Sequence, residues 1–62
     1  MRIQQNTITL TKREMAKYED SGPDGYDFRR EVKAMAQELA NKRKQNVTIE
    51  TPDYTAEQIR PD

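Results

Sequence analysis

A long amphipathic helix from Asp27 to Lys44 is the strongest prediction from the pattern of hydrophobic and polar positions. At about 100° per residue the apolar side chains form one stripe, made of Phe28, Val32, Met35 and Leu39, with Ala36 and Ala40 on its shoulder. The opposite side is basic and polar. Glu38 precedes Lys42 by one turn, which is the favourable order for an i,i+4 ion pair. We therefore expect this helix to bury its apolar stripe and expose its basic side.

Shorter segments on both sides of this helix alternate polar and apolar residues and predict β-strands. Residues 7–10 and 47–51 alternate and include β-branched side chains, which favour strands. Pro52 and Asp53 have the chemistry of a type I turn. Residues 54–60 then form either a strand that closes a hairpin or a helix, which Pro61 would limit to about one turn. We favour the strand.

A second, shorter helix is predicted from local capping signals. Thr11 and Glu14 have the spacing of a capping box, in which each side chain bonds the backbone of the other residue. The helix should therefore begin at Lys12. It should end at Ser21-Gly22-Pro23, with the glycine in a left-handed conformation and the proline unable to continue the helix.

The ends of the long helix are also predicted from local chemistry. The segment Gly22-Pro23-Asp24-Gly25 is typical of a tight turn, and Asp27 after it is a good N-cap residue. At the other end, Asn46 is suited to the left-handed position that closes a helix.

Together these elements predict a small α+β domain with the order β-α-α-β-β. One domain spans residues 1–62, with residues 1–6 and 60–62 as flexible ends. We expect the long helix to pack on a short antiparallel sheet of two or three strands. A winged-helix-like layout is compatible with this order.

Composition favours a binding protein over an enzyme. The chain has no cysteine and no histidine, which excludes disulfides and the usual zinc sites and leaves few catalytic nucleophiles and bases. We expect no cofactor and no metal. The chain also lacks a long apolar run and an apolar signal segment near its start, which predicts a cytoplasmic protein without a membrane partner.

The distribution of charge leads to the first functional hypothesis. The net charge is zero, but residues 1–17 and 29–46 have an excess of bases, and residues 18–28 and 47–62 an excess of acids. Cations that displace counterions, beside amides that read adenine, are the side chains that bind double-stranded DNA. The candidate DNA-binding residues are Arg29, Arg30, Lys33, Gln37, Asn41 and Lys44 on the long helix, and Lys12, Arg13 and Lys17 on the short one. The leading hypothesis is a DNA-binding transcriptional regulator or accessory factor.

Two other functional interpretations of the sequence are alternatives to DNA binding. The segment from Asp20 to Glu31 partly matches a calcium loop, but Gly22 and Phe28 stand where oxygen ligands belong, so we expect turn and cap roles instead. The second reading is a protein-interaction module without a nucleic-acid role. Domains this small often need a partner or a second copy of themselves, so a homodimer is one form of this alternative.

Overall fold

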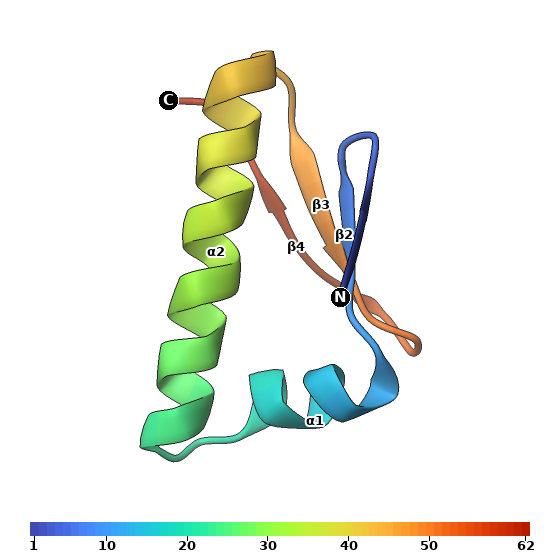
Figure 1. Cartoon of the computed structure of the whole chain (residues 1–62), viewed down its shortest axis with the longest axis vertical. Coiled ribbons are helices and arrows are strands. Elements are labelled where there is room, and N and C mark those ends of the chain that lie inside the picture. Colours follow the sequence, from blue (N-terminus) through green and yellow to red (C-terminus); the bar gives the residue numbers. More distant parts are fainter.

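Six elements follow one another along the 62 residues, all of which the computed structural model describes. In chain order they are β1 (Arg2–Gln4), β2 (Thr7–Thr9), α1 (Lys12–Glu19), α2 (Pro23–Arg43), β3 (Val47–Glu50) and β4 (Thr55–Ile59). Figure 1 shows α2 standing along one side of the sheet, with α1 lying across the end where α2 begins. The α+β class is confirmed.

The sheet is mixed and has four strands, whereas we expected two or three antiparallel ones. Its order is β1-β2-β3-β4, with antiparallel pairing at both ends and parallel pairing between β2 and β3. The two helices between β2 and β3 allow this parallel pairing, because parallel strands need a long crossover connection. The predicted C-terminal hairpin is confirmed, since Thr55–Ile59 pairs with Val47–Glu50.

The additional strand lies at the N-terminus. Residues 1–6, which we expected to be a flexible end, contain β1 and the turn that joins it to β2. Gln5 in this turn has a φ of 54°, and its carbonyl accepts a bond of 2.5 Å from the Arg43 guanidinium. The end of α2 therefore holds the hairpin turn in place, a contact between residues far apart in sequence.

The capping box at the start of α1 is confirmed. The amide of Glu14 donates to the Thr11 hydroxyl at 3.1 Å, and the amide of Thr11 donates to the Glu14 carboxylate at 2.9 Å. The predicted end of α1 is wrong in its details. The helix ends at Glu19, and Gly22 has a φ of −80° rather than a left-handed one.

Helix α2 begins one turn earlier than predicted. Its N-cap is Gly22 and its first residue is Pro23, so Asp27 lies inside the helix. Proline suits the first position of a helix because the amide hydrogen that it lacks would have no partner within the helix there. The left-handed residue at the other end is Lys44, with a φ of 56°, and not Asn46. There the amides of Lys44 and Gln45 both bond the carbonyl of Ala40, which closes the helix in a Schellman-type turn.

The core lies between α2 and the sheet, but a different line of α2 is buried from the one we expected. The residues at its centre are Val32, Ala36 and Ala40, all 0% exposed. Small side chains let the helix approach β3 and β4 closely. Two members of the predicted stripe, Met35 and Leu39, lie on the flank of α2 and are only partly buried. None of the helices is both long enough and apolar enough to cross a bilayer.

Candidate functional site

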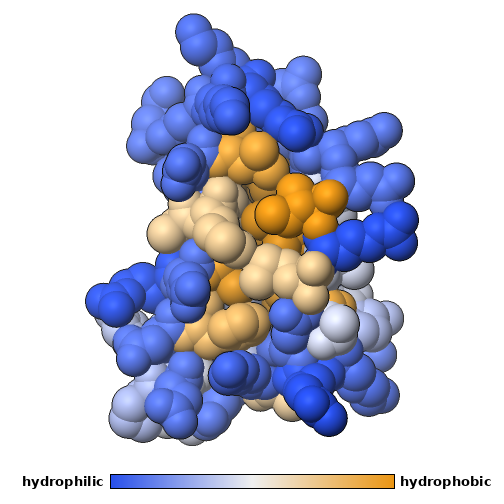
Figure 2. All heavy atoms as spheres, viewed as in Figure 1, coloured by the Kyte–Doolittle hydropathy of each residue, from blue (hydrophilic) through white to orange (hydrophobic).

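An exposed apolar surface lies between α2 and β1. We define the α2–β1 face as Met1, Ile3, Met35 and Leu39. Ile3 is 53% exposed, a high value for a large apolar residue, and Met1 is 43% exposed as a whole residue and 23% exposed in its side chain. Figure 2 shows an apolar area in the middle of this side of the molecule, surrounded by hydrophilic residues.

The position of Ile3 in the sheet explains why this surface is uncovered. Ile3 pairs with Ile8, and Ile8 pairs with Ile49, so the three residues share the side of the sheet that faces α2. Ile8 and Ile49 are 0% exposed because α2 lies over this part of the sheet. The helix packs mainly on β3 and β4, which are at the opposite edge of the sheet from β1 and Ile3. Strand β1 therefore has the same apolar orientation as its neighbours without a cover.

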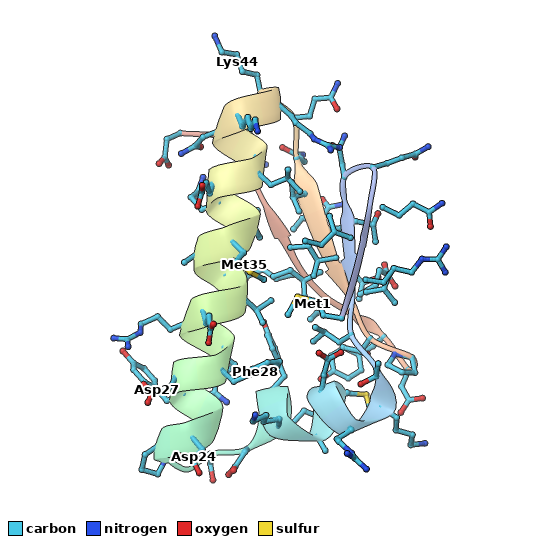
Figure 3. All side chains as sticks on the ribbon, viewed as in Figure 1. Met1, Asp24, Asp27, Phe28, Met35 and Lys44 are labelled. Carbon is cyan, nitrogen blue, oxygen red and sulfur yellow. The ribbon has the colours of Figure 1, made fainter.

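Side chains from α2 and from the N-terminus converge on the uncovered space. Met35 points from α2 toward Met1, with Phe28 further down the same side of the helix (Figure 3). An open hollow of about 230 Å³ lies here, lined by Ile3, Met35, Glu38, Leu39 and Lys42. Three of the lining side chains are apolar, and the other two, one acid and one base, are exposed to solvent, so we call these two the rim.

The two charges at the rim have no ion-pair partner within the chain. The predicted pair between Glu38 and Lys42 is not formed. The three ion pairs of the structure join Met1 to Glu14, Arg30 to Asp27, and Lys33 to Glu57. Both rim charges are therefore available to a partner.

The outer edge of the sheet adds a second feature to this surface. Strand β1 pairs with β2 on one side only, and its three residues Arg2–Gln4 are all exposed. Its remaining backbone groups can bond an added strand.

Three of the predicted DNA-binding cations on α2 have contacts within the chain. Arg29 donates to the carbonyls of Tyr18 and Asp20 at 2.7 and 2.6 Å, which ties α2 to the end of α1. Arg30 lies 3.5 Å from the Asp27 carboxylate, and Lys33 lies 3.3 Å from Glu57. The last two ion pairs are exposed and therefore weak. Another anion, such as a phosphate, can replace the carboxylate in either pair.

The two predicted base-reading amides contact the C-terminal residues. Gln37 donates to the carbonyl of Arg60 at 2.7 Å. The side-chain oxygen Oδ1 of Asn41 accepts bonds from the Gln37 side-chain amide at 2.9 Å and from the backbone amide of Asp62 at 2.8 Å. Residues 60–62, which we expected to be a flexible end, thus lie against this side of α2. Base contacts by these amides would need that segment to move away.

The other four predicted cations, Lys12, Arg13, Lys17 and Lys44, are exposed. Lys44 is at the end of α2 farthest from α1, so the structure does not bring it together with the three on the short helix (Figure 3). Lys17 lies over the Phe28 ring, 5.3 Å from its centre.

The candidate DNA-binding residues did not include the aromatic residue that lies among the α2 cations. Tyr26 is 58% exposed and, with Arg29, Arg30 and Lys33, lines an open hollow of about 260 Å³. Its ring lies 5.8 Å from the Arg30 guanidinium. The signal that could have revealed it is the i, i+3, i+4, i+7 spacing, which places these four residues on one side of a helix.

Of the segment that partly matched a calcium loop, Asp20 caps the end of α1, and the residues from Pro23 onward are in α2. Asp24 and Asp27 are labelled along the lower part of that helix in Figure 3. No three acidic, cysteine or histidine residues lie together in a group that could hold a metal ion.

Shifted pKa values occur at the joints of the fold. Bonds from the N-terminal amine and from the Thr11 amide lower the pKa of Glu14. A hydrogen bond to Glu19 raises the pKa of Tyr54 to about 12, and burial raises the pKa of Tyr18. These groups lie around α1 and the β3–β4 turn and not on the α2–β1 face.

Comparison of the chain with protein-family models, curated proteins and solved structures found no match to any of them.

Proposed function

We propose that this protein is a non-enzymatic protein-interaction module that binds its partner through the α2–β1 face. The observation that carries the proposal is the exposure of Met1 and Ile3 beside Met35 and Leu39, on one continuous side of a very small domain. Contiguous apolar surface with a polar surround is typical of interaction sites, because its burial removes it from water at about 25 cal/mol per Å².

The position of this surface supports the same function. It combines large flexible side chains, including two methionines, with an unpaired strand edge. Methionine adapts its shape to a partner, and a strand edge supplies directional backbone bonds. A partner would therefore gain both apolar contact and a defined orientation.

Site-specific cross-linking tests the proposal. A photoreactive phenylalanine analogue replaces Met35 on the α2–β1 face, and in a matched control it replaces Ala34, the neighbouring exposed residue. We expect irradiation in cells that express the protein to give a product of discrete mass from position 35 but not from position 34. Equal patterns, or no product from position 35 in a folded variant, would contradict the proposed interaction.

DNA binding is the second candidate function, and the hollow lined by Tyr26, Arg29, Arg30 and Lys33 favours it. Cations bind phosphates, and an exposed aromatic ring can stack on a base. The winged-helix-like layout belongs to this candidate, with the β3–β4 hairpin beside α2 as the wing.

A titration of duplex DNA at about 50 and 200 mM salt tests this candidate. Replacing Arg30 and Lys33 with alanine should weaken binding to all sequences and lower the salt slope by about one per lost phosphate contact. Removal of residues 60–62 should strengthen binding if Gln37 and Asn41 read bases, since it frees both amides. Absence of wild-type binding at the lower salt concentration would exclude this function.

A further inference from the structure

We propose that the partner on the α2–β1 face is a second copy of this chain, bound about a two-fold axis perpendicular to α2 near Leu39. The inference rests on the proposed interaction function and names its partner. In a two-fold contact the same surface is used by both copies, so it must be complementary to itself.

The charges at the rim of the hollow meet this requirement. Glu38 and Lys42 are one turn apart on the same flank of α2, and neither is ion-paired within the chain. A perpendicular two-fold axis makes the two helices antiparallel. If it passes midway between Glu38 and Lys42, beside Leu39, the acid of each copy faces the base of the other. Two equivalent ion pairs then enclose the apolar centre.

The apolar centre also complements itself. Leu39 lies between the two charged residues in sequence, so it is closest to the axis and meets its counterpart. Met35 and Ile3 line the same hollow and extend the contact toward β1. Methionine can fill the remaining irregular space because its side chain is unbranched and flexible.

The size and charge of the chain are compatible with this assembly. The net charge is zero, so two copies do not repel each other as whole molecules. Stable interfaces bury roughly 800 Å² on each partner. That area is roughly a fifth of the 4441 Å² that the chain exposes. The contact therefore has to extend over the α2–β1 face and not only over the hollow.

The oligomeric state tests the proposal directly. Sedimentation equilibrium of the intact chain, from micromolar to millimolar concentration, should show a rise from the monomer mass of 7.3 kDa to twice that value. Ile3→Gln should weaken the dimer by at least about tenfold, because it places an amide in the apolar centre. Arg2→Gln is the matched control on the same strand, and its side chain points to the other face of the sheet. It should leave the dissociation constant within about threefold of the wild type.

Charge exchange distinguishes this interface from a general loss of stability. Glu38→Lys alone places like charges opposite each other, and so does Lys42→Glu alone, so each should weaken self-association by at least about tenfold. An equal mixture of the two folded variants should form mixed dimers, since each base then faces an acid. A double variant with both substitutions should recover the wild-type affinity.

The outcomes separate this proposal from the broader function. A wild type that stays at the monomer mass at millimolar concentration overturns the homodimer, and so do variants that remain monomeric when mixed. If position 35 still cross-links to a different protein, the interaction function stands with another partner. If it gives no product at all, both proposals fail.

Discussion

Gly25 is the residue on which the close packing of α1 against α2 most directly depends. It is buried in the first turn of α2, where a Cβ atom would lie 2.1 Å from the carbonyl oxygen of Asp20. No real contact is that short, and the obstructing atom belongs to the backbone. Glycine at this position therefore serves a close approach between two chain segments.

Gly25→Ala should destabilise the protein by at least about 2 kcal/mol, because the clash outweighs the higher helix propensity of alanine. Gly22→Ala is the control. Its Cβ would meet only the Asp20 side chain, at 3.3 Å, and the substitution should cost less than about 1 kcal/mol. Urea denaturation of the three proteins measures both changes. Equal stability of the two variants would show that the helices can separate at little cost.

The hydrogen bond between Tyr54 and Glu19 ties the β3–β4 turn to α1. The phenol donates to the carboxylate at 2.6 Å, which raises the pKa of Tyr54 to about 12 from the ordinary value of 10.0. A raised folded-state pKa means that this contribution to stability is fully present below pH 10 and is lost as pH rises through 12.

Glu19→Gln should return the pKa of Tyr54 toward 10.0, because the carboxylate that opposes ionisation is removed. The ring carbon bonded to the phenol oxygen reports this pKa by NMR and separates Tyr54 from Tyr18 and Tyr26. An unchanged titration of Tyr54 would mean that the bond does not form in solution.

At the scale of the elements, the termination of α2 is the feature most open to a stability test. Lys44 adopts the left-handed conformation that usually favours glycine, and the amides of Lys44 and Gln45 both bond Ala40. A residue with a Cβ atom loses roughly 1–2 kcal/mol in that conformation. The helix end is therefore closed by a residue that is not the best for the position.

Lys44→Gly should stabilise the protein by about 0.5–1 kcal/mol, after the greater freedom of glycine in the unfolded chain is included. Asn46→Gly should give no gain, because Asn46 is not in the left-handed region. Thermal melts followed by circular dichroism compare the two. A larger gain at position 46 would indicate that α2 ends where the sequence pattern predicts.

For the whole molecule, the asymmetric placement of α2 over the sheet determines both the core and the exposed face. Ile49 is 0% exposed beneath the helix, and Leu39 is only partly buried on its flank. The same helix therefore divides its apolar residues between folding and the α2–β1 face.

Ile49→Ala should cost about 2–5 kcal/mol, which is a large part of the stability of a domain this size. Leu39→Ala should cost clearly less, because its side chain already contacts water. Denaturation at one low protein concentration, where self-association contributes least, gives the comparison. Equal losses at the two positions would place Leu39 in the core, as the helical periodicity alone predicts.

Local patterns in the sequence determined the class of the protein and most of its elements. The capping box of Thr11 and Glu14, the strands around Ile8 and Ile49 and the C-terminal hairpin depend on neighbouring residues, so they could be predicted. The basic side of α2 was also predictable, as a property of helical periodicity.

Only the tertiary structure decided which side of α2 is buried, where it lies on the sheet and what covers its polar side. Helical periodicity centred the predicted apolar stripe of α2 on its largest apolar residues. Close packing on β3 and β4 instead buries a line of smaller residues, Val32, Ala36 and Ala40. Strand β1, with a single apolar residue, became a strand through its pairing with β2. The Gln37 side chain donates a hydrogen bond to the backbone carbonyl of Arg60, a contact that no local sequence pattern encodes. The α2–β1 face results from these long-range contacts, because a surface stays exposed only when the rest of the chain packs elsewhere.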